Sequence, residues 1–226
     1  FEMTQERASI LETADRFARR ELAPLFQRMD AEEWWPENAM RKIGDAGLIG
    51  VAVDDSYGGA GLDFFCQGLV IQAIARHNSS IGLSYATHEN LFVNNLYRNG
   101  TAAQKQKYLP QCIRGEMIGA LGMTEPGAGS DAIGSMATVA RREGDHYILD
   151  GRKLFITNGP IADVMIVYAK TAKERGAKGV SAFLVEKGFP GFSVAQTLSK
   201  MGNRGSPTGE LVFEQCRVPV ENLLGE

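Results

Sequence analysis

The sequence lacks the features that mark several large classes of protein. Its three cysteines, Cys66, Cys112 and Cys216, form neither a CxxC pair nor an even set that could build a disulfide framework, which fits a reducing compartment. No apolar run approaches the roughly 20 residues of a membrane span. The N-terminus also lacks the charged and apolar regions of a signal peptide. We therefore expect a soluble protein with no membrane partner.

The charge balance shows no basic excess. The 24 Lys and Arg residues are outnumbered by 27 Asp and Glu residues, which gives a net charge of −3 and a pI near 5.7. Nucleic-acid-binding surfaces need clustered positive charge, so we expect no nucleic-acid partner. Hydrophobic residues make up 44% of the chain, enough for the core of one large domain or two smaller ones. These properties favour work on small molecules.

The first half of the chain has the pattern of helices, because apolar residues recur at three- and four-residue spacing. Capping signals mark several ends: Asp63 is a suitable N-cap, and Thr101 with Gln104 forms a capping box. We expect helices over residues 4–27 (bent at Pro24), 36–47, 63–77, 79–98 and 101–115, with a surface loop at 54–61.

After about residue 116 the chain changes to short runs of Val, Ile, Phe, Tyr and Thr separated by Gly, Asn, Asp and Pro. The expected strands are 135–142, 147–149, 153–157, 164–169, 180–185, 192–197 and 211–214. No crossover helices intervene, so the runs predict a small antiparallel barrel or sandwich. The fold class is therefore α+β, with a helical domain over residues 1–116 and a β-domain over 117–226.

Three short motifs are misleading. Residues 127–132 match the spacing GxGxxA of a dinucleotide fingerprint, but a strand-like run follows them instead of the helix of a βαβ unit. His88-Glu89 begins like a zincin motif, but Phe92 stands where the second ligand should be, so we predict no metal site. No serine sits in a GxSxG elbow, so serine hydrolysis is unsupported.

Two polar runs, residues 124–131 and 155–160, each follow a strand-like segment. Gly127 and Gly129 permit positive φ and a close backbone approach, and Pro126 fixes the chain before them. Backbone N–H groups, Thr hydroxyls and the Phe155 ring together suit a large heteroaromatic cofactor. Two ordinary hairpin turns are the alternative interpretation.

Longer motifs resemble one family. MTEPGAGSD, LFITNGPIADVMIVYAKT, GVSAFLVEKGFPGFSV and KMGNRGSPTGELVFEQCRVPVENLLGE are similar to the acyl-CoA dehydrogenases. YGGAGLD and NGTAAQKQKYLPQCIRGE resemble the same family's helical domain, and SYATHENLFVNNLYRNG is most similar to its isovaleryl-CoA dehydrogenase branch. The resemblance spans nearly the whole chain and corresponds to the family's N-terminal and middle domains.

The resemblance implies that FAD lies between the middle β-domain and a C-terminal helical bundle. It implies a set of flavin-contacting residues in two runs: Leu121, Met123, Thr124, Gly129 and Ser130, then Phe155, Ile156 and Thr157. In this assignment Met123 and Thr124 offer donors to the pyrimidine edge, and Thr157 bonds flavin N5. Phe155 lies against the ring where many members carry Trp, and Ser130 reaches the acyl-CoA substrate. Leu121 stands where medium-chain members carry Tyr, which weakens a medium-chain assignment.

The implied reaction is α,β-dehydrogenation of a short, branched acyl-CoA, with electrons passed to an electron-transfer flavoprotein. The resemblance also implies a homotetramer in the bacterial cytoplasm or the mitochondrial matrix. The alternatives are an acyl-CoA oxidase, a flavin monooxygenase relative, and a non-catalytic binding module of the same architecture.

The family's catalytic glutamate belongs to the C-terminal bundle, beyond Glu226. We therefore expect this chain to be a fragment, with the bundle absent, and to be inactive by itself. Glu125 belongs to the flavin loop in the family pattern, so we assign no catalytic residue.

Overall fold

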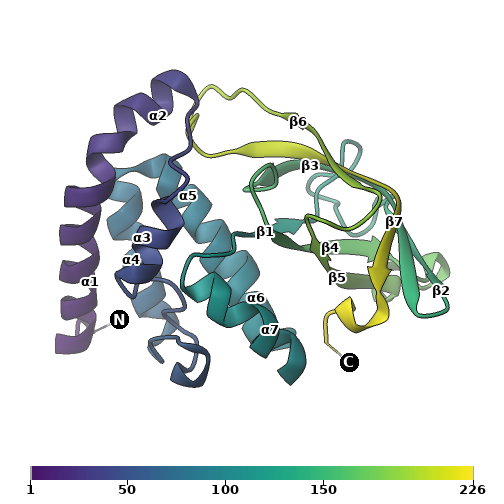
Figure 1. The fold of residues 1–226 in the computed structure, drawn as a ribbon, viewed down its shortest axis with the longest axis horizontal. Helices are drawn as coiled ribbons and strands as arrows, with labels where there is room; N and C mark the ends of the chain where they lie inside the picture. The colour runs from purple at the N-terminus through teal and green to yellow at the C-terminus, as the bar shows by residue number, and fades with distance from the viewer. Residues whose placement is uncertain (1, 226) are drawn as a thin grey trace.

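The computed structural model describes residues 2–225 as a group of helices followed by a curled β-sheet, which confirms the predicted fold class (Figure 1). The helices are α1 (Gln5–Phe17), α2 (Phe26–Glu32), α3 (Ala39–Asp45), α4 (Phe64–His77), α5 (Ser79–Ala86), α6 (Asn95–Asn99) and α7 (Ala102–Ile113). No helix among residues 2–225 is both long and apolar enough to cross a bilayer.

The predicted bend at Pro24 is confirmed. After α1 the chain forms a π-helical turn (Ala18–Leu22) and a 3₁₀ turn (Ala23–Leu25), and then continues as α2. Proline cannot donate a backbone hydrogen bond and its ring crowds the preceding turn, so regular α-helix stops there.

Local capping signals set the helix ends as predicted. The Asp63 carboxylate accepts the Cys66 N–H at 2.8 Å, and α4 begins at the next residue. Thr101 and Gln104 form the reciprocal capping box at the start of α7. The expected helix over 79–98 has a π-helical middle, η4 (Thr87–Asn94), between α5 and α6. Such wide turns are rare and often occur at functional sites.

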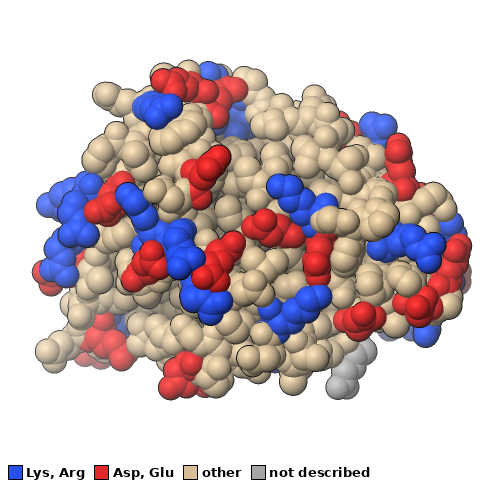
Figure 2. All heavy atoms as spheres, viewed as in Figure 1, with Lys and Arg blue, Asp and Glu red and all other residues tan. Residues whose placement is uncertain are grey.

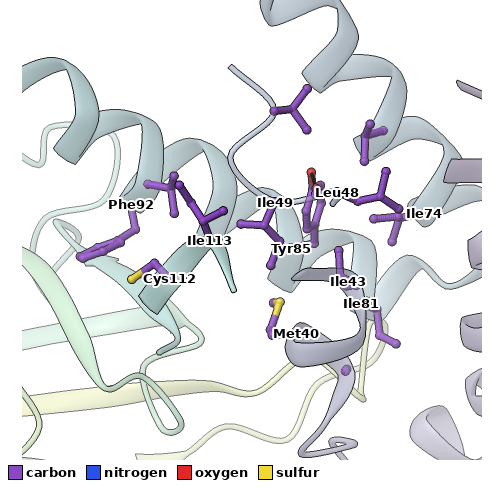
Figure 3. Packing of buried hydrophobic residues seen from close by; sticks show 14 of the residues in the cluster. Met40, Ile43, Leu48, Ile49, Ile74, Ile81, Tyr85, Phe92, Cys112 and Ile113 are labelled. Carbon is purple, nitrogen blue, oxygen red and sulfur yellow. Dashed lines mark hydrogen bonds between the residues drawn. The ribbon is translucent and has the colours of Figure 1, made fainter. Parts of the chain in front are cut away.

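The helices bury one large apolar cluster, part of which is drawn in Figure 3. Val164, Ile166 and Leu184 from the sheet also belong to this cluster. The core of the helical part therefore continues onto one face of the sheet. A second apolar cluster belongs to the sheet and includes Met165 and Val167, which alternate along β4 with the residues of the first cluster. The division into two domains at residues 116 and 117 stays a prediction.

The described residues form a seven-stranded sheet: β1 (Gly119–Gly122), β2 (Val139–Glu143), β3 (His146–Thr157), β4 (Val164–Lys170), β5 (Val180–Glu186), β6 (Phe192–Thr197) and β7 (Thr208–Pro219). The strand order is β1-β4-β2-β3-β7-β6, and β5 pairs with β4. Most pairs are antiparallel, but β1 runs parallel to β4 and β2 touches β4 in parallel register. The β2–β3 hairpin and the long segments around it supply the connection that parallel pairing needs, without a crossover helix.

The predicted break at Asp150-Gly151 is wrong, because β3 runs through it as one long strand. Gly151 has a φ of 152°, and the register against β7 shifts between Leu149 and Gly151. The extra residue lies on β7, where Glu214 and Gln215 stand opposite Asp150, and such a bulge bends the chain while pairing continues on both sides.

Charged side chains are mixed over the surface. On the face seen in Figure 2, Lys and Arg lie among Asp and Glu without a broad region of one sign. At the tip of the β6–β7 hairpin, Arg204 donates to the Asp30 carbonyl at 2.7 Å and pairs with Glu33 at 2.9 Å. This contact attaches the hairpin to the end of α2 (Figure 1).

Candidate functional site

The start of the first predicted polar run, Thr124, and the start of the second, residues 155–157, meet at one hollow with a volume of about 180 Å³. Leu121, Met123 and Thr124 line it from the end of β1, and Phe155, Ile156 and Thr157 line it from the end of β3. Thr87 and Leu91 of η4 complete the lining. The hollow therefore lies where the helical part meets the sheet.

Another bulge, with its extra residue on β3 itself, brings the two runs together. The register against β7 shifts between Lys153 and Ile156, and Phe155 has a φ of 60°. Leu154 bonds Thr124 instead of β7: its N–H donates to the Thr124 carbonyl at 2.9 Å, and its carbonyl accepts the Thr124 hydroxyl. The same turn leaves the Phe155 ring 67% exposed, as an open aromatic surface.

Polar groups at the hollow remain available to a ligand. Within residues 2–225, neither the Thr157 hydroxyl nor the backbone N–H groups of Met123 and Thr124 have a protein partner. The Thr124 hydroxyl is already committed to Leu154. Hydroxyl and N–H donors beside an exposed aromatic ring and aliphatic side chains suit a flat heteroaromatic molecule with acceptors on its edge.

Sequence reasoning missed the helical wall of the hollow. Thr87 and Leu91 lie four residues apart in η4, and Leu91 is 42% exposed. An amphipathic helix pattern does not reveal a π-helical turn, so nothing in the local sequence singled them out. Glu89 lies between them but does not line the hollow, because its carboxylate instead accepts the N–H groups of Gly50 and Val51, each at 2.8 Å.

Beside the hollow, Glu125 and Lys153 form a buried ion pair with a separation of 2.8 Å. The Glu125 carboxylate also accepts the N–H groups of Ala137 at 2.6 Å and Thr138 at 3.0 Å. Burial opposes ionisation of Glu125, but the Lys153 ammonium and these N–H groups outweigh it, so its pKa lies below the ordinary value. Burial lowers the pKa of Lys153, and Glu125 opposes that effect. Glu125 thus closes the loop over residues 126–138 and has no free carboxylate oxygen to act as a base.

The expected positive φ of Gly127 and Gly129 is wrong, since neither glycine adopts it. The turn is closed by two hydrogen bonds between the backbones of Glu125 and Ala128, with Pro126 at its second position. A turn of this kind works with negative φ throughout. Gly129 and Ser130 are exposed and do not line the hollow, so their contacts with cofactor and substrate stay predictions.

His88 is a neutral link between elements. Its Nδ1 accepts the Gly119 N–H at 2.9 Å, so Nε2 carries the proton and donates to the Cys112 carbonyl at 3.0 Å. Burial lowers its pKa to about 4. Throughout the part of the chain that the structure describes, no three His, Cys, Asp or Glu side chains are arranged to hold a metal ion.

Two family models match the chain. Residues 4–116 match "Acyl-CoA dehydrogenase, N-terminal domain", and residues 120–216 match "Acyl-CoA dehydrogenase, middle domain". Together they cover most of the chain and confirm the resemblance found in the sequence motifs.

Individual relatives agree with these models. The mitochondrial isovaleryl-CoA dehydrogenase of Pongo abelii is 47% identical over 99% of this chain and 53% of its own length. The structure of butyryl-CoA dehydrogenase from Megasphaera elsdenii has a TM-score of 0.94 and 36% identity, covering 100% of this chain and 60% of that one. A glutaryl-CoA dehydrogenase from Mycobacterium smegmatis in complex with FADH2 has a TM-score of 0.92 and 32% identity, covering 98% and 56%. The chain spans about half the length of the curated relative.

Proposed function

This chain belongs to the acyl-CoA dehydrogenase family, and on that premise we propose that it forms the flavin-binding part of an FAD-dependent acyl-CoA dehydrogenase. The observation that carries the proposal is the hollow at which the ends of β1 and β3 meet. Six of the eight residues that the family resemblance assigns to flavin contact line this one site, and Gly129 and Ser130 lie outside it.

The lining fits a flavin ring. Phe155 offers an exposed aromatic face and Leu121 supplies aliphatic contact, whereas the Ile156 side chain packs in the second core cluster. Met123 and Thr124 have free N–H groups for the acceptors of the pyrimidine edge, and Thr157 has a free hydroxyl for N5. The glutaryl-CoA dehydrogenase of similar fold is described in complex with FADH2.

When bound, FAD would accept a hydride from the β-carbon of an acyl-CoA thioester. The part of this chain in the reaction is to bind and orient: the bulge at Phe155 fixes the aromatic platform, and the Leu154–Thr124 bonds fix the donors relative to it. Thr87 and Leu91 close the helical side and reduce access of water. We propose that Ser130, in the exposed loop, contacts the acyl-CoA.

The α-proton needs a carboxylate base that neither buried glutamate near the site supplies. Glu125 is engaged by Lys153 and two N–H groups, and Glu89 faces Gly50 and Val51. We propose that the base comes from a region corresponding to the rest of the longer relatives. Residues 1–226 by themselves should therefore show no turnover, and measurable dehydrogenation by this chain alone would contradict that.

A short, branched acyl-CoA is the substrate that we propose, because a relative 47% identical to this chain is an isovaleryl-CoA dehydrogenase. An electron-transfer flavoprotein as electron acceptor, a homotetrameric assembly, and a mitochondrial or bacterial cytoplasmic location belong to the same proposal.

The test uses the full-length protein and its visible absorbance. Isovaleryl-CoA should bleach the bound flavin band near-completely, and straight-chain acyl-CoA of equal length should do so more slowly. A colourless protein that takes up no added FAD would favour a non-catalytic module. Rapid reoxidation by oxygen in a stopped-flow experiment would favour an oxidase or monooxygenase, whereas slow reoxidation is expected here.

A further inference from the structure

Lys153 is a buried cation directly behind Met123, one of the residues that line the hollow. Its side chain is 0% exposed, and its ammonium makes two contacts, with Glu125 at 2.8 Å and with the Met123 carbonyl at 3.1 Å. Burying an ammonium is costly unless its hydrogen bonds are satisfied. The stability of the buried Lys153 therefore depends on the positions of these two partners. One of its two partners is a backbone group of the hollow itself.

The carbonyl that Lys153 contacts shares a peptide unit with the Thr124 N–H. All peptide bonds of the described chain are trans, so the carbonyl and the N–H lie on opposite edges of this unit. With the Met123 carbonyl toward Lys153, the Thr124 N–H points away from it. That N–H has no protein acceptor within residues 2–225. A cation bonded to the carbonyl polarises the peptide and strengthens the N–H as a donor.

The remaining bonds hold this peptide in place. The Thr124 carbonyl and hydroxyl are both bonded to Leu154, the residue after Lys153. The Glu125 carboxylate fixes the far end of the loop through Ala137 and Thr138. The segment therefore cannot turn its N–H elsewhere without breaking several buried contacts, so the donor is preorganised.

We infer that Lys153 is a positioning residue for the flavin, which acts through the Met123–Thr124 peptide to favour the negative charge that the pyrimidine edge gains on reduction. This inference rests on the proposed function. Glu125 balances the lysine and keeps the buried pair neutral overall, so the two residues should move the flavin potential in opposite directions. A merely structural pair would not produce opposite signs.

The experiment compares the full-length protein with Lys153→Met, Glu125→Gln and the double variant, and measures the FAD dissociation constant and the two-electron midpoint potential. Lys153→Met should weaken FAD binding about tenfold or more and make the potential more negative. A tenfold preferential loss for the reduced cofactor corresponds to about 30 mV. Glu125→Gln should make the potential more positive. The midpoint potential of the double variant should again be more negative than that of wild type. This variant replaces Lys153→Met in the test if Lys153→Met alone does not fold.

Lys170→Met is the matched control, because Lys170 also donates to a carbonyl of the same loop, that of Gly134 at 2.9 Å, but outside the lining of the hollow. The FAD dissociation constant of Lys170→Met should stay within about twofold of the wild-type value. Its midpoint potential should be unchanged to within a few millivolts. Wild-type protein that binds no FAD would overturn the proposed function and this inference together. Wild-type binding with unchanged potentials in the Lys153 and Glu125 variants, or with shifts of one sign, would overturn this inference alone.

Discussion

Glu89 and Glu125 are two buried glutamates that have the same kind of backbone partners but pKa values shifted in opposite directions. Each accepts two main-chain N–H groups, Glu89 from Gly50 and Val51 and Glu125 from Ala137 and Thr138. Glu125 also has Lys153 at 2.8 Å, whereas no cation of the described chain pairs with Glu89. Burial raises the pKa of Glu89 to about 7, while Glu125 has a pKa below its ordinary value.

The difference shows that two N–H donors alone do not keep the pKa of a buried carboxyl group low, whereas two donors together with an ammonium do. At Glu89 they do not offset the loss of water, so the group titrates near neutral pH. At Glu125 the added ammonium makes the charge permanent in the neutral range. The charge beside the hollow is therefore fixed, and the charge in the helical core, where Glu89 holds the loop before α4, can change.

The largest effect should come from removing the cation. Lys153→Met leaves the Glu125 carboxylate buried without its ion-pair partner, which typically costs about 3–5 kcal/mol of unfolding free energy. Urea unfolding at pH 7 measures it. The double variant with Glu125→Gln should recover most of the loss, because no charge is then stranded. Lys170→Met should cost less than about 1 kcal/mol, because Lys170 is only half-buried and has no ion-pair partner in the described chain. Equal losses for Lys153→Met and Lys170→Met would contradict a special role for the buried ion pair in stability.

A second effect should appear in the pH dependence of stability at Glu89. Its folded pKa of about 7 lies above the ordinary 4.5, so the folded state binds the proton more tightly. The associated stability is fully present below pH 4.5 and is lost as the pH rises to 7, by about 3 kcal/mol. Glu89→Gln should abolish this loss, measured as the difference between the two unfolding curves across pH 4.5–7.

His88 adds a slope of the opposite sign, which is why the difference between the two proteins is the quantity to measure. Its pKa falls from 6.5 to about 4, so the unfolded state binds more protons between these values and stability rises with pH there. This contribution is common to wild type and Glu89→Gln and cancels in the subtraction. Parallel curves for the two proteins would contradict the assignment to Glu89.

The smallest effect concerns the two threonines of the hollow. Thr124→Val removes the bond from the hydroxyl to the Leu154 carbonyl and should cost about 1 kcal/mol. Thr157→Val removes a hydroxyl without a protein partner in the described chain and should change the unfolding free energy by less than about 0.5 kcal/mol. Thermal or urea unfolding of both variants checks this; a larger loss for Thr157→Val would mean that its hydroxyl serves the fold instead of a ligand.

The part of the fold that could be predicted depends on local chemistry. Asp63 and Thr101 cap helices through residues three positions away, so the sequence alone locates those helix ends. The parallel pairing of β1 with β4 and the unbroken course of β3 through Gly151 depend on partners far along the chain. No local pattern contains that information.

The site divides in the same way. Phe155 and Thr157 were identified because their motif carries polar and aromatic groups together at a strand end. Thr87 and Leu91 were missed because the π-helical turn that presents them leaves no mark in the apolar pattern. Glu125 and Lys153 belong to two separate motifs, and only the folded structure shows that they form a buried ion pair.

The most direct measurement is FAD affinity in the full-length protein for three forms: wild type, the Glu125→Gln/Lys153→Met double variant, and Glu89→Gln. If the fixed pair serves the flavin site and Glu89 serves only the helical core, the dissociation constant rises at least about tenfold in the double variant and stays within twofold of wild type in Glu89→Gln. Equal losses in both variants, or no loss in the double variant, would contradict the account.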